Sequence, residues 1–146
     1  MQDDPLEQAL DALEAERYAE AASLLQALLQ RSPDDGDLHH YLAIAYFYQG
    51  DHSAALAAFE LALNYSPDDL TLADNLIRAG YELFGKKQYL ESQPFFRLLN
   101  QSGAYYSQSW LYLARALKQS NQTEAAAEVL QQGLQCSPDE DRKSVV

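Results

Sequence analysis

The sequence predicts an all-α fold built from four tandem helix–turn–helix repeats. The chain has 146 residues, and three of its segments end alike, at Ser32-Pro33-Asp34-Asp35, Ser66-Pro67-Asp68-Asp69 and Ser137-Pro138-Asp139-Glu140. The first two prolines lie 34 residues apart, and the last two lie 71 apart, which is two periods of 34 plus three. Strand-like alternation and hairpin turns are absent, so a helical repeat explains the pattern best.

Four units of 34 residues fit the chain if three residues are inserted near Leu70-Thr71-Leu72. The units span residues 2–35, 36–69, 73–106 and 107–140, in one domain over 1–140, and residues 141–146 form a short disordered tail. The insertion either lengthens the loop before the third unit or lengthens the first helix of that unit. Both alternatives keep the repeat.

Size-restricted positions recur in every unit. One column is small throughout and consists of Ala9, Ala43, Gly80 and Ala114. A second small column, twelve residues later, consists of Ala21, Ala55, Ser92 and Ala126. Four residues further on, the chain has Leu25, Phe59, Phe96 and Leu130. Small residues let two helices approach closely, and a large apolar residue one turn later fills the space beyond them.

Each unit contains two amphipathic helical segments, and the second unit shows them best. Residues 38–49 and 53–64 have helical patterning, Gly50-Asp51 separates them, and Ser66-Pro67-Asp68 turns the chain toward the next unit. Proline and aspartate at that place end one helix and cap the next. In the third unit Pro94 falls inside the second helix, where a missing backbone donor is expected to bend it.

The order and spacing of these residues resemble the tetratricopeptide repeat (TPR) family. In the second unit the matching residues are Leu42, Ala43, Tyr46, Gly50, Ala55, Phe59, Ala62 and Pro67. In the fourth they are Trp110, Leu113, Ala114, Leu117, Ala126, Leu130 and Pro138. The resemblance covers about 95% of the chain and implies eight antiparallel helices in a right-handed superhelical solenoid.

The resemblance also implies that the first helix of each unit lines a concave groove. Helix periodicity then selects the candidate binding residues, which are Leu10, His40, Tyr41, Ile44, Tyr48, Arg78, Tyr81, Tyr112, Arg115 and Lys118. The helix around Tyr41 is apolar or aromatic on all sides, and the three basic residues add positive charge to the C-terminal half. A peptide or helix of a partner protein with apolar anchors and an acidic end would suit this surface.

The composition argues against several other functions. The chain carries 22 acidic and 10 basic residues, a net charge of −12, which disfavours nucleic acid and anionic membranes as partners. The whole imbalance lies in residues 1–69, which hold 14 acidic and two basic residues. This acidic half is either a solvated surface or a region that steers a basic partner.

No enzyme chemistry, cofactor or metal is expected. Cys136 is the only cysteine, and the neighbouring His39 and His40 point to different sides of a helix. No catalytic residues are predicted. The N-terminus lacks the pattern of a secretory signal, and no apolar segment is long enough to span a membrane, so we expect a cytoplasmic protein.

The sequence leaves two functions open. The first is an adaptor or scaffold that binds another protein through its groove. The alternative is a small acidic cytoplasmic chaperone for a secreted or assembly-prone protein, similar to the TPR chaperones of type III secretion. Polar residues at both ends, such as Glu124 and Glu128 on the last helix, favour a monomer.

Overall fold

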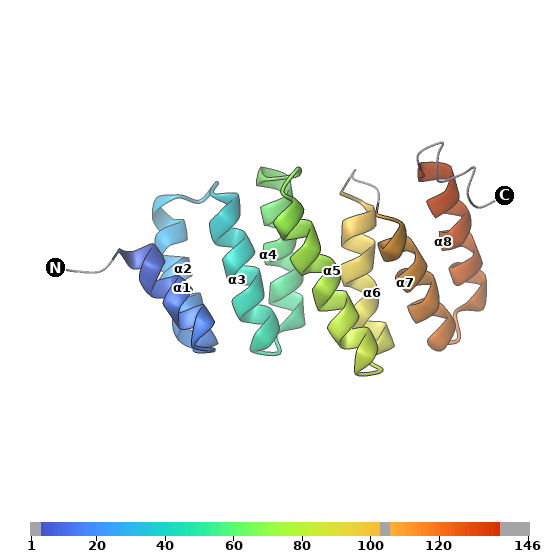
Figure 1. The fold of residues 1–146 in the computed structure, drawn as a ribbon, viewed down its shortest axis with the longest axis horizontal. Helices are drawn as coiled ribbons and strands as arrows, with labels where there is room; N and C mark the ends of the chain where they lie inside the picture. Colours follow the sequence, from blue (N-terminus) through green and yellow to red (C-terminus); the bar gives the residue numbers. More distant parts are fainter. Residues whose placement is uncertain (1–3, 103–105, 138–146) are drawn as a thin grey trace. The chain divides into compact units, whose positions relative to one another are not determined.

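The computed structural model describes residues 4–102 and 106–137, and this part of the chain forms eight α-helices and no strand (Figure 1). The helices are α1 (Pro5–Glu14), α2 (Tyr18–Arg31), α3 (Gly36–Tyr48), α4 (His52–Tyr65), α5 (Leu70–Gly85), α6 (Tyr89–Asn100), α7 (Ser107–Gln119) and α8 (Thr123–Cys136). The predicted all-α helical repeat solenoid is confirmed, with two helices in each predicted repeat. The tail predicted at 141–146 lies outside the described residues.

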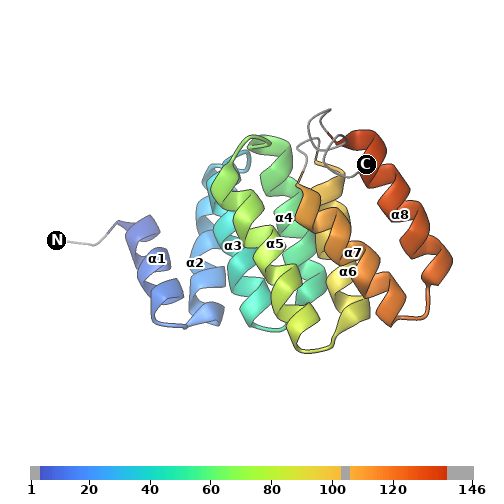
Figure 2. The same cartoon turned by 45° about the vertical axis from the view of Figure 1, so that its right-hand side comes forward.

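The chain divides into two compact units, Met1–Leu72 and Ala73–Val146. Helices that follow each other in the chain pack side by side within each unit, as α1, α2, α3 and α4 do in the first and α6, α7 and α8 do in the second (Figures 1 and 2). Contacts between sequence neighbours are the defining property of a repeat protein. The single domain over 1–140 and the right-handed superhelix stay predictions.

Aspartates in the turns between repeats begin the next helix. The side chain of Asp35 accepts hydrogen bonds from the backbone N–H groups of Asp37 and Leu38, at 3.0 and 3.4 Å. Asp69 accepts from those of Thr71 and Leu72 in the same way, at 3.0 and 3.2 Å. Each carboxylate satisfies N–H groups that have no partner inside the helix, so the Ser-Pro-Asp-Asp segments cap α3 and α5.

The three inserted residues lengthen a helix. Asp69 caps α5 at the position that Asp35 has one period earlier, yet α5 has 16 residues where α3 and α7 have 13. The insertion is therefore taken up as extra length within α5, and not as a longer loop. The sequence left this choice open because both alternatives preserve the repeat.

The turn inside each repeat has one backbone conformation. Its central residue has a positive φ in all four repeats, and these residues are Glu16, Gly50, Lys87 and Asn121. The N–H of the next residue donates to the carbonyl five residues earlier, as from Gln88 to Leu83 at 2.9 Å and from Gln122 to Leu117 at 2.8 Å. This is a Schellman ending, which favours glycine, and only one of the four turns has glycine there.

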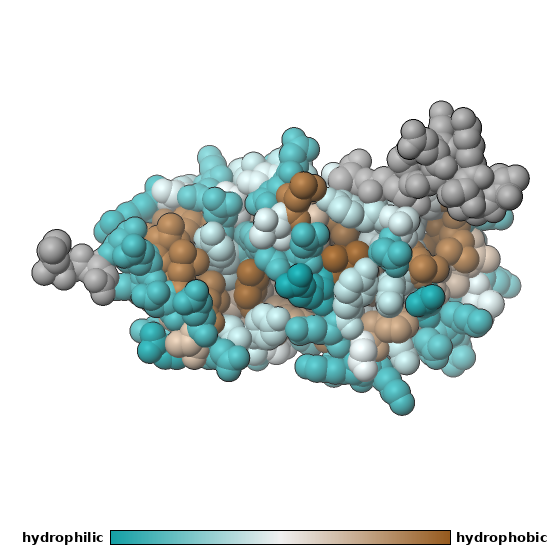
Figure 3. Space-filling model, viewed as in Figure 1, coloured by the Kyte–Doolittle hydropathy of each residue, from teal (hydrophilic) through white to brown (hydrophobic). Residues whose placement is uncertain are grey.

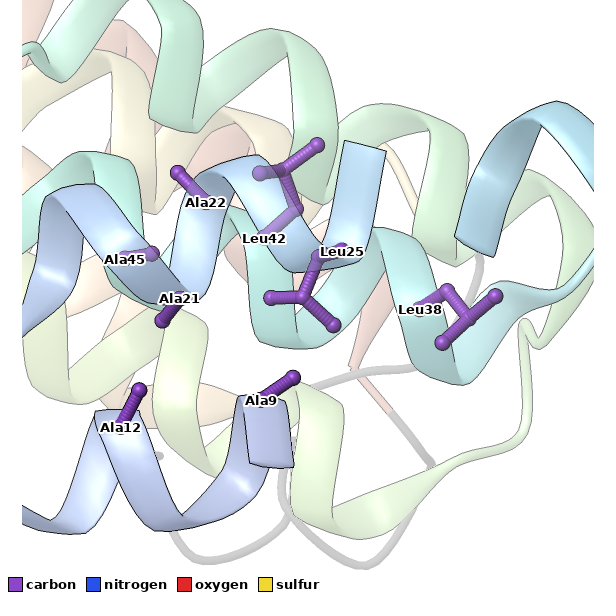
Figure 4. Close-up of a cluster of buried hydrophobic side chains, with 8 residues drawn as sticks. All are labelled: Ala9, Ala12, Ala21, Ala22, Leu25, Leu38, Leu42 and Ala45. Atoms are coloured by element: carbon purple, nitrogen blue, oxygen red, sulfur yellow. The ribbon is translucent and has the colours of Figure 1, made fainter. Parts of the chain in front are cut away.

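The small columns are the sites where paired helices approach each other. Their members Ala9, Ala21, Ala43, Ala55, Gly80, Ser92, Ala114 and Ala126 are all buried. Figure 4 shows the cluster of the first unit, which takes Ala9 and Ala12 from α1, Ala21, Ala22 and Leu25 from α2, and Leu38, Leu42 and Ala45 from α3. Leu25, Phe59 and Phe96 are at most 1% exposed, whereas Leu130 in the same column is 45% exposed.

Helix α6 runs without interruption from Tyr89 to Asn100 through Pro94. The neighbouring Gln93 is buried, and its side-chain amide donates to Ser120 Oγ at 3.3 Å and to Gln122 Oε1 at 3.0 Å. These hydrogen bonds attach α6 to the turn between α7 and α8. The third and fourth repeats are thus joined by buried polar contacts as well as by apolar packing.

We expect Gly80→Ala to destabilise the protein by about 1 to 3 kcal/mol, because a Cβ atom at Gly80 would lie 2.6 Å from the ring of Phe96. Gly85→Ala is the matched control, since a Cβ atom there meets nothing within 4 Å. That change should leave stability unchanged or raise it by up to about 1 kcal/mol. Urea unfolding of both variants checks this, and equal effects would contradict it.

Lys87→Gly should stabilise the protein by about 1 kcal/mol, because Lys87 has φ 64° and glycine adopts this conformation without a Cβ clash. Gly50→Ala should have the opposite effect, since Gly50 has φ 85°. Thermal unfolding followed by circular dichroism measures both. A Lys87→Gly variant that is less stable than the natural chain would refute the assignment of strain to this turn.

Candidate binding surfaces

The ten predicted binding residues lie on the first helices of their repeats, and each unit holds five of them. The first unit has Leu10 on α1 and His40, Tyr41, Ile44 and Tyr48 on α3. The second unit has Arg78 and Tyr81 on α5 and Tyr112, Arg115 and Lys118 on α7. The two sets differ in chemistry, because the first is mainly apolar and the second is aromatic and basic.

Part of the first set belongs to the interior. His40 is only 4% exposed, and its ring stacks on that of Tyr41 with centroids 5.6 Å apart and an interplanar angle of 13°. Tyr41 is half-buried and packs against the apolar cluster of α1, α2 and α3. Both side chains therefore contribute to the packing of α3, and Leu10 and Ile44 are likewise half-buried.

Tyr48 is the most open member of the first set, at 46% exposure. Its ring stacks on that of Tyr18 with centroids 5.2 Å apart, and it meets Phe47 edge-on at 5.2 Å. The sequence did not point to Tyr18, because Tyr18 lies on a second helix and no helical spacing connects it with Tyr48. The pair forms an aromatic surface beside the apolar residues of α3.

Acidic residues lie near His40 and Tyr41 of the first set. Burial lowers the pKa of His40, and the carboxylates of Asp69 and Asp37 oppose that shift only in part. Burial also raises the pKa of Tyr41, and Asp37, Asp69 and Asp35 add to the effect. His40 is therefore kept neutral, and the first surface has a negative electrostatic environment.

The second set, which we call the second surface, forms an aromatic cluster with a cation above it. The ring of Tyr112 lies 4.7 Å from that of Tyr81 and 5.2 Å from that of Phe84, between centroids. Phe96 of α6 lies beneath, 5.8 Å from Tyr112. The guanidinium carbon of Arg115 lies 5.1 Å from the centroid of Tyr112, which is the geometry of a cation–π interaction.

A pocket of about 570 Å³ opens beside this cluster, between α5 and the start of α7. Its lining residues are Asp74, Ile77, Arg78, Tyr81, Tyr106, Ser107 and Gln108. Arg78 and Asp74 supply opposite charges, while Ile77 and Tyr81 supply apolar walls. Sequence reasoning did not select Asp74 and Tyr106, because only tertiary packing brings the start of α7 next to α5.

The cations of the second surface have no acidic partner among residues 4–102 and 106–137. Arg78, Arg115 and Lys118 are exposed and make no ion pair in that part of the chain. By contrast, Arg17 and Glu20 pair at 2.9 Å along one side of α2. The three cations are therefore available to an acidic ligand.

Residues 4–102 and 106–137 lack the features of two other kinds of site. These ranges hold no group of three or more His, Cys, Asp or Glu side chains that could bind a metal ion. None of the described helices is both long enough and apolar enough to cross a membrane.

The fold and these surfaces define a helical repeat protein of the kind used for protein–protein interaction. Residues 12–79 match the family model of the tetratricopeptide repeat. The matched segment is slightly under half of the chain, and the other described helices continue its helix–turn–helix architecture.

The individual proteins that resemble this chain have low sequence identity to it. The chain is 30% identical over 134 residues to Protein FlbA of Caulobacter vibrioides, a match that covers 92% of this chain and 22% of the relative. It therefore spans about a fifth of that protein's length. Among solved structures, a crystal structure of MamA has a TM-score of 0.59 at 13% identity, over 96% of this chain and 73% of the other. MamA of Desulfovibrio magneticus RS-1 has a TM-score of 0.57 at 20% identity, over 92% of this chain and 74% of the other. These two likenesses show the fold.

Stability should fall as the pH drops below about 6.5, in part because His40 is buried and neutral. The unfolded chain binds a proton there more readily than the folded chain does, so acid favours unfolding. His40→Gln removes this contribution and should flatten the dependence between pH 7 and pH 5.5. Urea unfolding at a series of pH values measures it, and an unchanged slope would argue against a lowered pKa.

Proposed function

We propose that this protein is a non-enzymatic interaction module, an adaptor or scaffold, which binds a peptide or helix of a partner protein on the first helices of its repeats. Tetratricopeptide repeat proteins generally act in this way, and both units present surface of suitable chemistry. We also propose that the protein is a monomer and needs no cofactor.

The aromatic and basic surface of the second unit is the observation that carries this proposal. Tyr81 and Tyr112 offer flat apolar contact area, and the pocket beside Arg78 can take one large side chain of a ligand. Arg78 and Arg115 can each form paired hydrogen bonds with a carboxylate. A segment with an apolar anchor and one or two acidic residues fits this combination.

The first unit would supply a different contact. It includes the apolar or aromatic residues Leu10, Ile44, Tyr18 and Tyr48, and the carboxylates of Asp35, Asp37 and Asp69 act on the neighbouring Tyr41. This surface suits an apolar segment with basic flanks.

Charge reversal at the second surface should abolish partner binding. We expect the variant Arg78→Glu, Arg115→Glu to lose a partner that the natural chain captures from a lysate of its source organism, because both substitutions repel acidic groups. Both residues are exposed, so the fold should survive, and circular dichroism verifies this. Mass spectrometry identifies the captured protein.

Arg97→Glu is the matched control, because Arg97 is an exposed arginine of the same unit on α6, outside the second surface. It changes the net charge in the same direction and should leave capture intact. If both variants lose the partner equally, the loss is an effect of net charge. If both retain the partner equally, the second surface does not bind it. A captured partner that is insoluble without this chain would favour the chaperone alternative over an adaptor.

A further inference from the structure

Helices α5 and α7 run in the same direction at the second surface. Near their starts, Asp74 of α5 and Gln108 of α7 line the pocket together. Further along, the ring of Tyr112 on α7 lies 5.2 Å from that of Phe84 on α5, between centroids. Early positions of one helix therefore lie beside early positions of the other, and later positions beside later ones.

The exposed charges along this direction change sign once. Asp74 and then Arg78 are the exposed charged residues of α5, and both line the pocket. Those of α7 are Arg115 and Lys118, which lie in the second half of that helix. Glu82 of α5 is half-buried and does not line the pocket. A ligand that follows the two helices thus passes an acidic side chain first and basic ones afterwards.

The opposite charges at the pocket do not neutralise each other. Asp74 and Arg78 are four residues apart, a spacing at which ion pairs form along a helix, yet no ion pair joins them in residues 4–102 and 106–137. Both side chains are exposed. Each charge is therefore available to a ligand group of the opposite sign.

An apolar seat lies beside these two charges. Ile77, Tyr81 and Tyr106 are half-buried and line the pocket. Figure 3 shows apolar surface between α5 and α7, with hydrophilic side chains on both sides of it. The pocket volume of about 570 Å³ falls within the range of roughly 300 to 1,000 Å³ that is usual for ligand pockets. One apolar side chain of a ligand can therefore be anchored there.

A further repeat of this chain would not cover the pocket. In a repeat protein each repeat packs only against its neighbours. The third repeat already has the fourth as its neighbour, because α7 packs on α6 and the ring of Tyr112 lies 5.8 Å from that of Phe96. A repeat that followed α8 would pack on α7 and α8 in the same way. The occupant of the pocket is therefore a segment that lies across the first helices, α5 and α7.

We propose that the second surface selects a partner segment in which an apolar anchor has a basic residue on one side and acidic residues on the other. The basic residue pairs with Asp74. The anchor enters the pocket beside Ile77 and Tyr81, and the acidic residues pair with Arg78 and Arg115. The proposal rests on the function proposed above, to which it adds the basic residue and the order of the charges. An acidic residue in place of the basic one would face Asp74 and be repelled.

The sequence that follows α8 in this chain is a poorer occupant. Its acidic residues, Asp139, Glu140 and Asp141, are followed directly by Arg142 and Lys143. No apolar residue stands between the two kinds of charge, so this segment lacks the order that the surface requires.

The test uses two fluorescein-labelled peptides of equal length, each with one tryptophan at its centre. In the first, two lysines precede the tryptophan and two glutamates follow it, and in the second, glutamates stand on both sides. We expect the full natural chain to bind the first peptide about ten-fold more tightly by fluorescence anisotropy at low ionic strength. Both peptides have the apolar anchor and acidic residues of the proposed function, and only the charge order requires this difference.

Asp74→Lys should reverse the preference, because the introduced cation repels the lysines and attracts the glutamates. Asp74 is exposed, so the fold should survive, and circular dichroism verifies this. Glu91→Lys is the matched control, since Glu91 is an exposed acidic residue of α6 in the same unit and does not line the pocket. It changes the net charge by the same amount and should keep the preference of the natural chain.

A preference that shifts equally in both variants would overturn the proposal, since net charge would then be its cause. Equal binding of the two peptides to the natural chain would overturn it as well, while the proposed function would stand. If neither peptide binds but a partner is still captured through Arg78 and Arg115, the charge order is wrong and the proposed function is not.

Discussion

The close approach of paired helices at small residues is the constraint on which the rest of this structure depends. Ala9 and Ala21, or Gly80 and Ser92, leave room for a neighbouring backbone, and Leu25 or Phe96 one turn later fills the space beyond them. Gly80 shows how little freedom remains, since the ring of Phe96 occupies the place of its missing Cβ. Each close contact fixes the pairing of two helices. Their other sides are then free for the next repeat, or for a ligand.

The outer sides of the first and the last described helix differ in polarity. The N-terminal face carries aspartates and a glutamine where the internal repeats carry leucine, alanine or serine. The last described helix keeps the apolar residues of an internal repeat. The difference comes from one physical fact, that leucine stabilises a repeat interface only when another helix removes it from water.

Charge and chemistry also divide along the chain. All of the net charge of −12 comes from residues 1–69, and the three cations of the second surface, Arg78, Arg115 and Lys118, lie on α5 and α7. The first unit therefore has an acidic surface around apolar and aromatic residues, and the second has basic residues around aromatic ones. Under the proposed function, each unit would contact a partner segment of a different chemistry.

The sequence alone determined the repeat, because the period and the size-restricted columns are local properties that recur in every unit, and aspartates cap the first helices of the first three units. It also determined which helices carry the ten candidate residues. It could not decide whether the three inserted residues extend a loop or a helix, since both alternatives preserve the repeat, and only the structure shows them in α5.

Tertiary packing also decided that His40 is interior, that Tyr18 stacks on Tyr48, and that Asp74 and Tyr106 line one pocket with Arg78. These facts depend on which neighbour covers a side chain. Helical periodicity predicts which side of a helix a residue lies on, but not what packs against that side. Leu25 and Leu130 therefore hold the same position in their repeats but differ in exposure.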